Sequence, residues 1–230
     1  MEGILLVDKP VGWTSFDVVA LVRKTISHSE NIKPSQVKVG HTGTLDPLAS
    51  GLLVLLIGKQ YTKMATELTK LDKEYIVQLK LGEITDSIDL ESEPQFYSSV
   101  KPTKDQIVHS LKSFEGRIMQ IPPAFSAIKV NGQRAYDLAR KGKQVELKSR
   151  PVTIYSINLT KYDYPNVSFK TKVSSGTYIR SLASDIGRLL KCGAYMSGLK
   201  RTSVGDFKLK DSLKMDSVSL DKINNYLLFV

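Results

Sequence analysis

Five segments of the chain have the apolar patterns of β-strands. Leu52–Ile57 is an unbroken apolar run, which is typical of a strand that is buried on both faces. Lys73–Leu81 alternates between apolar and polar residues, which is typical of a strand with one buried face. The predicted strands are Ile4–Val7, Leu52–Ile57, Lys73–Leu81, Ala124–Val130 and Val167–Val173.

Helices are predicted where apolar residues recur every three or four positions. Thr14 and Thr103 each open a capping box, so a helix is expected to begin after each of them. Phe16 and Val19 follow Thr14 at helical spacing. The other predicted helices are Thr62–Leu71, Ala135–Lys141 and Ile179–Leu190. Because strands and helices come in mixed order without a βαβ rhythm, the sequence predicts an α+β fold.

The composition is that of a globular protein with one large domain or two small ones, since 41% of the 230 residues are hydrophobic and 24% are charged. Cys192 is the only cysteine, which excludes an intramolecular disulfide and cysteine-based metal sites and favours a reducing cytoplasm. The three histidines lack ligand spacing, so no metal is expected. The N-terminal residues do not resemble a signal peptide, and no apolar run could span a bilayer.

The net charge of +10 favours a polyanionic partner, with nucleic acid first. The charges are segregated along the chain. Residues 129–150 hold seven basic and two acidic residues, whereas Glu83–Glu93 holds five acidic residues and no basic one. This separation favours a directed basic face over a diffuse lysine-rich surface. We expect the acidic stretch, within a loop or strand edge, to point away from a phosphate backbone.

The loop Gly40–Gly51 is the strongest candidate for chemistry, because three glycines and Pro47 shape it around one carboxylate, Asp46. A carboxylate on a stiff loop beside a core strand is positioned rather than free, as a nucleophile or general base must be. The alternative is an ordinary turn or helix-capping aspartate, which is what most Asp residues in Gly/Pro-rich loops are.

Several further segments occur in a specific order around this loop. They are Asp8-Lys9-Pro10, Lys73-Glu74-Tyr75, residues 122–127 (PPAFSA), Asn131-Gly132, residues 175–180 (SGTYIR), Leu199-Lys200-Arg201-Thr202, Gly205 and Phe207. In order and spacing they resemble the TruB family, the bacterial tRNA pseudouridine synthases that modify uridine 55 in the T loop. The resemblance covers residues 3–207. It implies a central, largely antiparallel sheet with a catalytic cleft across it and helices around it.

The resemblance also implies a reaction without cofactor or metal. The bond between ribose and uracil N1 breaks, the base turns, and C5 takes the place of N1. Asp46 matches the family's nucleophile, which attacks either the ribose C1′ or the uracil C6. Arg180 matches its cationic partner, since a guanidinium can pair with a carboxylate bidentately and keeps its charge. Tyr75 matches the active-site tyrosine, although an aromatic residue on an apolar strand face is usually core.

The remaining matched positions are expected to bind substrate. They are Lys9, His41, Lys63, Asp86, Tyr178 and Leu199. His41 matches the residue that fills the space left by the extruded base, and Asp86 would be the one member of the acidic stretch near the substrate. The alternatives are a locally satisfied loop histidine, solvated lysines, packing of Tyr178 at a helix start, and core packing of Leu199.

The partner implied is the T arm of tRNA, bound without a membrane and without an obligatory protein partner, by a monomer. Residues 1–207 form the expected catalytic domain, and an insert at about 117–150 grips the RNA. Its expected RNA-binding residues are Lys129, Arg134, Arg140, Lys141 and Lys143. Residues 208–230 are expected to be a short extension, too few for the RNA-binding PUA domain that relatives carry.

Other functions fit the residues less well. A P-loop is excluded by spacing, because six residues separate Gly51 from Gly58 and Gln60 follows Lys59. An aspartic-protease motif is excluded because His41 stands where an aspartate is required. The main competing hypothesis is an RNA-binding folding helper that performs no chemistry, for which Asp46 would be dispensable.

Overall fold

The structure is a computed structural model that describes residues 1–126, 128–130, 132–142 and 145–229. The chain divides into two compact units. Unit 1 comprises Met1–Tyr75 and Leu199–Val230, and unit 2 comprises Ile76–Gly198. Strands β4 (Lys73–Leu81) and β12 (Ala194–Val204) contribute residues to both units.

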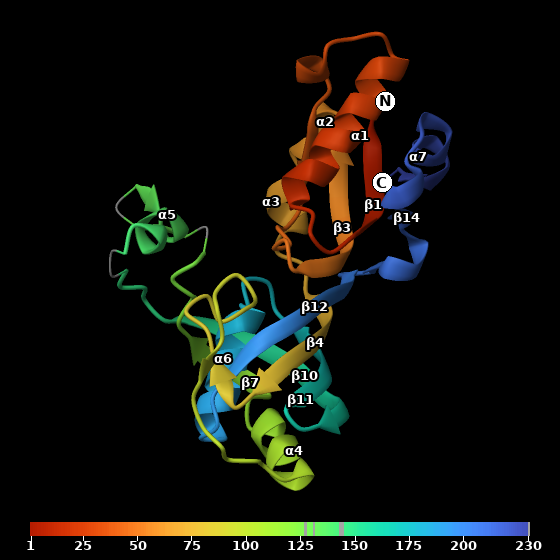
Figure 1. The fold of residues 1–230 in the computed structure, drawn as a ribbon. Coiled ribbons are helices and arrows are strands. Elements are labelled where there is room, and N and C mark those ends of the chain that lie inside the picture. Colours follow the sequence, from red (N-terminus) through yellow and green to blue (C-terminus); the bar gives the residue numbers. More distant parts are fainter. Residues whose placement is uncertain (127, 131, 143–144, 230) are drawn as a thin grey trace. The chain divides into compact units, whose positions relative to one another are not determined.

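Unit 1 contains a sheet in which β1 and β3 are the central antiparallel pair (Figure 1). Strand β3 also pairs in antiparallel fashion with β2 and in parallel with β12, while β1 pairs in parallel with β14 and in antiparallel fashion with β15. The helices and strands of unit 1, besides its parts of β4 and β12, are β1 (Gly3–Lys9), α1 (Ser15–Ser29), β2 (Val39–His41), β3 (Ala49–Ile57), α2 (Lys59–Thr62), α3 (Ala65–Leu68), β13 (Phe207–Lys208), β14 (Leu213–Lys214), α7 (Leu220–Tyr226) and β15 (Leu227–Leu228). Single 3₁₀ turns lie at Pro34–Gln36, Leu209–Asp211 and Met215–Ser217.

Both faces of β3 are covered, which explains the unbroken apolar run Leu52–Ile57 within it. Leu53 and Leu55 point into a cluster with the buried residues of α1, and Leu52 and Val54 point into a second cluster with residues of α2 and α3. In Figure 1, α1 lies along one side of the β1–β3 pair, and α2 and α3 lie on the other. The prediction of a strand that is buried on both faces is confirmed.

The predictions for the helices of unit 1 are confirmed in part. Helix α1 begins after Thr14, and the capping box is present, with the Thr14 backbone N–H donating to Asp17 Oδ2 at 2.8 Å. Val19 is buried, but Phe16 is 65% exposed, because α1 faces the sheet with Val18, Val19, Val22 and Ile26. The continuous helix predicted for Thr62–Leu71 is wrong, since two short helices, α2 and α3, flank a break at residues 63–64.

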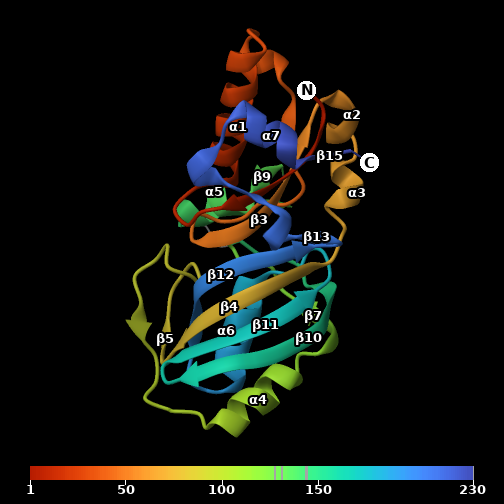
Figure 2. The same cartoon turned by 90° about the vertical axis from the view of Figure 1, so that its right-hand side faces the viewer.

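Unit 2 contains a sheet in the order β4-β11-β10-β7, with the antiparallel hairpin β10–β11 at its centre (Figure 2). Helix α6 has a buried apolar face that includes Leu182 and Ile186. Helix α4 contacts both β10 and α6. Besides its parts of β4 and β12, unit 2 contains β5 (Glu83–Ile84), β6 (Gln95–Phe96), α4 (Lys104–Lys112), β7 (Gly116–Gln120), β8 (Lys129–Val130), β9 (Gln133–Arg134), α5 (Ala135–Arg140), β10 (Arg150–Asp163), β11 (Asn166–Val173) and α6 (Ile179–Leu189).

Most predictions for unit 2 are confirmed. Strand β4, strand β11, helix α4 after Thr103, helix α5 and helix α6 lie where the patterns predict them. The strand predicted for Ala124–Val130 is wrong, because only Lys129–Val130 is strand among the described residues of this segment. The hairpin β8–β9 follows, and of its predicted turn Asn131-Gly132 the first residue lies outside the described residues.

The α+β class and the largely antiparallel sheet are confirmed. Antiparallel pairing joins β1 to β3 and β15, β2 to β3, β10 to β7 and β11, and β12 to β13, whereas β1–β14 and β3–β12 are parallel. The segment between β4 and α4 is irregular except for the short β5–β6 ladder, as expected. Within the described part of the chain, no helix has the length and apolar character needed to cross a membrane.

Candidate active site

The loop that carries Asp46 lies in unit 1 between β2 and β3. Asp46 is half-buried, and its carbonyl accepts a hydrogen bond from Ala49 N–H at 3.0 Å, which makes the segment a turn just before β3. Gly51 follows within β3 at φ +98°, and a Cβ there would meet the Arg201 carbonyl oxygen at 2.3 Å. Only glycine therefore allows β12 to approach β3 so closely where the loop ends.

Five hydrogen bonds from Gly12, Ser15 and Arg201 hold this loop and the start of the apolar run that follows it. Gly12 N–H donates to the Pro47 carbonyl at 2.8 Å, and the Ser15 hydroxyl contacts both backbone groups of Leu45. Arg201, which is 2% exposed, donates from Nη2 to the Gly43 carbonyl at 3.0 Å. Its Nε donates to the Leu52 carbonyl at 2.7 Å. The loop is therefore held on both sides of Asp46.

Arg201 was not among the sequence-predicted site residues. It belongs to the Leu199–Thr202 motif, so the signal was present, but a strand arginine is usually exposed. Its guanidinium donates to the Gly43 carbonyl in the loop and to the Leu52 carbonyl in β3. The motif thus supplies part of the scaffold of the Asp46 loop.

Lys9 is a cation of unit 1 whose charge interacts with that of Asp46. Its side chain is fully buried, and Nζ donates to the Pro10 carbonyl at 2.9 Å and the Trp13 carbonyl at 2.5 Å. Burial lowers the pKa of Lys9 to about 8, while the negative charge of Asp46 opposes this shift. At neutral pH the ammonium is mostly protonated and attracts the Asp46 carboxylate. The alternative of a solvated surface lysine is excluded for Lys9.

Lys73 and His41 are two further basic groups near Arg201 in unit 1. Burial lowers the pKa of Lys73 to about 8, with the positive charge of Arg201 contributing. The pKa of His41 is also lowered, by burial first and by Arg201 second. Gly43 N–H donates to His41 Nδ1 at 3.3 Å, so the neutral ring carries its proton on Nε2. His41 is therefore a neutral, locally bonded side chain beside the Asp46 loop.

The other predicted residues of unit 1 differ in exposure. Tyr75 is buried (8% exposed) on the apolar face of β4, Leu199 is half-buried on β12 next to Ala49 of β3, and Lys63 is exposed at the end of α2. Their proposed contacts with substrate stay predictions.

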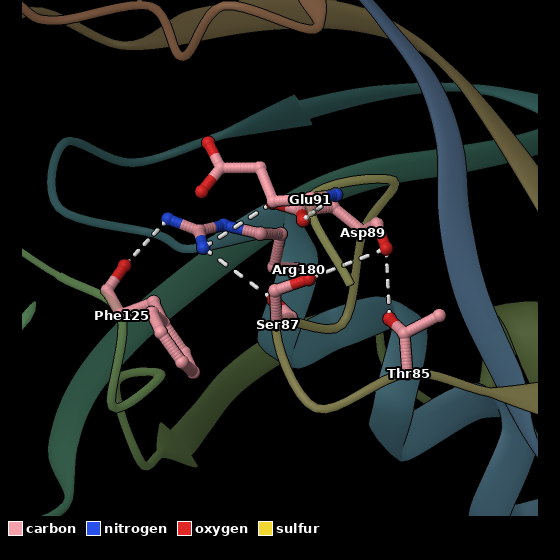
Figure 3. A network of polar contacts seen from close by, with 6 residues as sticks. All are labelled: Thr85, Ser87, Asp89, Glu91, Phe125 and Arg180. Atoms are coloured by element: carbon pink, nitrogen blue, oxygen red, sulfur yellow. Dashed lines mark hydrogen bonds and ion pairs between the residues drawn. The ribbon is translucent and has the colours of Figure 1, made fainter. Parts of the chain in front are cut away.

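Arg180 lies in unit 2, in the first turn of α6, and is 7% exposed (Figure 3). Its Nη1 forms an ion pair with Asp89 Oδ2 at 3.3 Å, and its Nη2 donates to the Phe125 carbonyl at 2.8 Å. A weaker contact joins Nη1 to the Ser87 carbonyl at 3.5 Å. The guanidinium is thus fixed between the acidic segment and the segment after β7. Because Asp46 belongs to unit 1, its predicted pairing with Arg180 stays a prediction.

Asp89 corrects the expectation for the acidic stretch. Asp89 is fully buried, whereas Asp86 is exposed. The hydroxyl of Thr85 donates to the Asp89 carbonyl at 2.8 Å, and Glu91 N–H donates to Asp89 Oδ1 at 3.0 Å (Figure 3). Asp89 therefore does not face outward with the rest of the acidic stretch, whereas the expected position of Asp86 near the substrate stays a prediction. The position of a buried partner for Arg180 was not visible in the sequence, because the two residues lie far apart along the chain.

Tyr178 is half-buried at the residue before α6. Its backbone N–H and carbonyl both bond the side chain of Gln120, at 2.8 Å and 3.1 Å. The Arg150 guanidinium lies over the Tyr178 ring, 4.8 Å from its centroid, and Nη2 of the same arginine donates to the Gly176 carbonyl at 2.7 Å. Both ends of the predicted insert therefore contact the turn that leads to Arg180.

The predicted RNA-binding residues are described only in part. Arg134 and Lys141 are exposed, at the end of β9 and just after α5. Lys129 lies in β8 and Arg140 in α5, but their side chains fall outside the described part, and Lys143 lies outside the described residues. The described residues contain no group of three or more His, Cys, Asp or Glu side chains arranged to hold a metal ion.

Comparison with known proteins gives two consecutive family matches. The sequence model of the TruB family pseudouridylate synthase (N terminal domain) matches residues 30–179, and that of the tRNA pseudouridylate synthase B C-terminal domain matches residues 180–227. The predicted domain boundary at residue 207 stays a prediction.

Curated relatives match over nearly the whole chain. A tRNA pseudouridine synthase B of Clostridium novyi is 47% identical over 230 residues, which cover 100% of this chain and 76% of that protein. The protein of the same name from Phocaeicola vulgatus is 48% identical over 218 residues, which cover 94% of this chain and 92% of that protein.

Solved structures share the fold. The Cbf5-Nop10-Gar1 complex contains a chain with a TM-score of 0.72 and 31% identity, matched over 97% of this chain and 57% of that one. An H/ACA RNP bound to a substrate RNA containing 2′-deoxyuridine gives a TM-score of 0.67 at 29% identity, over 93% of this chain and 51% of that one. This chain thus spans a little over half the length of these solved chains. With the family matches and the relatives, the chain belongs to the TruB family of pseudouridylate synthases.

Proposed function

We propose that this enzyme isomerises uridine 55 in the T loop of tRNA to pseudouridine, with Asp46 as the nucleophile. The reaction breaks the bond between ribose C1′ and uracil N1 and forms a bond between C1′ and C5. C5 loses its hydrogen as a proton to solvent, and N1 takes up a proton, so the product is an isomer of the substrate. The curated relatives are named as tRNA pseudouridine synthases, which supports tRNA as the substrate. The position within the T loop and the role of Asp46 come from the motif resemblance.

The anchoring of the Asp46 loop is the observation that supports the nucleophile most strongly. A covalent catalyst gains rate when its reacting atom is held close to attack geometry before the substrate arrives. Contacts from Gly12, Ser15 and Arg201 restrain the backbone on both sides of Asp46. The buried Lys9 places a positive charge close enough to Asp46 to interact with it, which suits a site for a negatively charged nucleophile.

Arg180 is the proposed second catalytic residue. A guanidinium keeps its charge at every relevant pH and can stabilise the negative charge of a carboxylate or of a reacting base. The ion pair with Asp89 and the bond to Phe125 hold the side chain in one position within unit 2. We propose that this restraint prepares Arg180 to face Asp46 when substrate is bound.

The remaining predicted residues have proposed roles around the base. Tyr75 would stack on the flipped uracil, which is worth on the order of 1–3 kcal/mol per base. His41, as a neutral ring, would fill the space that the extruded nucleotide leaves. The further substrate contacts proposed are those of Lys9, Lys63, Asp86, Tyr178 and Leu199.

The predicted insert is proposed to hold the T arm. Flipping a base out of a folded RNA costs a few kcal/mol, which phosphate contacts from the insert would help to offset. The exposed side chains of Arg134 and Lys141 are suited to such contacts. Action as a monomer and a cytoplasmic location are part of the same proposal.

The test is to map the product. Purified protein is incubated with an unmodified tRNA transcript, and pseudouridine is located by carbodiimide labelling and primer extension. The proposal expects modification at uridine 55, and none in a transcript in which that uridine is replaced by cytidine. Modification only at another uridine would contradict the T-loop assignment, and no modification would contradict the proposed tRNA activity.

A further inference from the structure

Ser15 makes two hydrogen bonds to the residue that immediately precedes Asp46. The Leu45 N–H donates to Ser15 Oγ at 2.8 Å, and Ser15 Oγ–H donates to the Leu45 carbonyl at 3.0 Å. One hydroxyl therefore satisfies both backbone polar groups of Leu45. The two residues are 30 positions apart in sequence, so this contact is tertiary rather than local.

These bonds are made in a dry environment. Ser15 and Leu45 are each 2% exposed, so water cannot replace the hydroxyl if it is removed. A buried N–H and a buried carbonyl would then lack partners, which costs free energy. The backbone at Leu45 would lower this cost by moving toward water or toward other hydrogen-bonding groups. Such a movement would be transmitted directly to Asp46, whose peptide bond is joined to Leu45.

The position of Ser15 is itself fixed. It is the first residue of α1, directly after the Thr14 capping box, and α1 packs its apolar face against the core of unit 1. The other anchors of the loop bind further from the carboxylate in sequence, at Gly43 and Leu52, or on its other side at Pro47. Of the contacts made by the described residues, the bonds of the serine hydroxyl are thus the ones nearest to Asp46 in sequence on its N-terminal side.

We infer that Ser15 is a positioning residue for Asp46, and that it acts on the rate of the chemical step by orienting the Leu45–Asp46 peptide. This inference rests on the proposed function, because it assumes that Asp46 is the nucleophile. Ser15 itself touches neither the carboxylate nor the base in this account. Its hydroxyl holds the loop, and the loop presents the carboxylate.

The chain offers a matched control on the same helix. Ser27 is also a buried serine of α1 (4% exposed), and its hydroxyl donates to the Lys24 carbonyl at 3.0 Å, within the helix. Ser27→Ala removes a buried hydroxyl bond from α1 without touching the Asp46 loop. A comparison of Ser15→Ala with Ser27→Ala therefore separates positioning of the loop from general loss of stability.

The first readout is single-turnover release of tritium from tRNA labelled at uracil C5, at saturating enzyme. Ser15→Ala is expected to slow release about 10- to 100-fold, the scale of a displacement of about 1 Å in a catalytic group, with tRNA affinity changed less than about 2-fold. Ser15→Cys has a side chain of similar size that forms weaker hydrogen bonds, so its rate of tritium release is expected to lie between those of wild type and Ser15→Ala. Ser27→Ala should leave the rate unchanged.

The second readout does not depend on activity. Hydrogen exchange, followed by mass spectrometry, is expected to be faster in the peptide containing Leu45 for Ser15→Ala but not for Ser27→Ala. Normal release by folded Ser15→Ala and Ser15→Cys would overturn the inference, as would failure of both to fold, which would give Ser15 a general structural role. Failure of the proposed function is recognised separately, by absent release from wild type or by normal release from Asp46→Asn.

Discussion

Arg180 and Asp89 form an ion pair of 3.3 Å in which both side chains are buried, at 7% and 0% exposure. A buried pair of this kind is costly to break from one side, because the remaining charge lacks both water and a partner. The pair joins α6 to the acidic segment between β5 and β6, and it leaves Nη2 of Arg180 bonded to Phe125. Asp89 thus controls where the arginine is held.

Asp89→Asn is expected to destabilise the protein by about 3–5 kcal/mol and to slow turnover, because the buried Arg180 guanidinium loses the negative charge of Asp89. Asp86→Asn is the matched control, since Asp86 is an exposed aspartate in the same segment, and its effect on the free energy of unfolding should stay within about 0.5 kcal/mol. Urea unfolding of both variants measures this. Equal stability of the two variants would show that the Arg180–Asp89 pair contributes little.

Gly51→Ala and Gly12→Ala test the close approach of β3 and β12. Both glycines have positive φ, +98° and +86°, so each substitution carries the backbone penalty of about 1–2 kcal/mol. A Cβ at Gly51 would also meet the Arg201 carbonyl at 2.3 Å, whereas a Cβ at Gly12 would meet nothing within 4 Å. Gly51→Ala is therefore expected to lose at least a further 1–3 kcal/mol in urea unfolding. Similar losses of unfolding free energy in the two variants would contradict the close approach of β12 to β3 at Gly51.

The lowered pKa of Lys73 predicts a stability that depends on pH. Its pKa is about 8 in the folded protein and about 10.5 when unfolded, so the unfolded chain binds more protons between these values. The contribution of Lys73 to stability therefore rises with pH, by about 2 kcal/mol from pH 8 to pH 10.

The measurement is the difference in unfolding free energy between wild type and Lys73→Met at several pH values. This difference should increase from pH 8 to pH 10, and it should be flat below pH 7. Lys70→Met, which removes an exposed lysine nearby, should show no such trend. A constant difference for Lys73→Met would mean that Lys73 titrates normally.

Salt dependence tests the predicted RNA contact of the insert. Replacement of Arg134 and Lys141 by glutamine is expected to reduce the slope of log affinity for tRNA against log salt by roughly 1–2, because each lost phosphate contact releases about one fewer counterion. Lys33→Gln is the control, since Lys33 is an exposed lysine of unit 1 outside the insert. An unchanged slope in the double variant would place the RNA contact elsewhere.

The elements that the sequence predicted well are those whose pattern reflects local burial. Leu52–Ile57 lies between two apolar clusters, so every position is apolar and the strand is unmistakable. Strands β10 and β12 were not predicted, because their sequences mix charged and apolar residues. In β12 a buried arginine, Arg201, breaks the pattern because its guanidinium bonds the Gly43 carbonyl of the Asp46 loop and the Leu52 carbonyl of β3.

The residues of the candidate site also divide into those that the local sequence marks and those that depend on distant parts of the chain. Asp46 could be predicted because glycines and a proline mark its loop in the sequence itself. Asp89 could not be told from Asp86, since burial of one of two neighbouring aspartates depends on Arg180, which is distant along the chain. The exposed side of α1 was misjudged at Phe16 for a related reason, because spacing alone does not say which residues of a helix face the sheet.

Asp46→Asn tests the central claim most directly. The variant keeps the size of the side chain and removes its charge and nucleophilicity. It is expected to bind tRNA with an affinity close to that of wild type and to release no tritium from tRNA labelled at uracil C5 in a single turnover. Release at the wild-type rate would contradict Asp46 as the nucleophile.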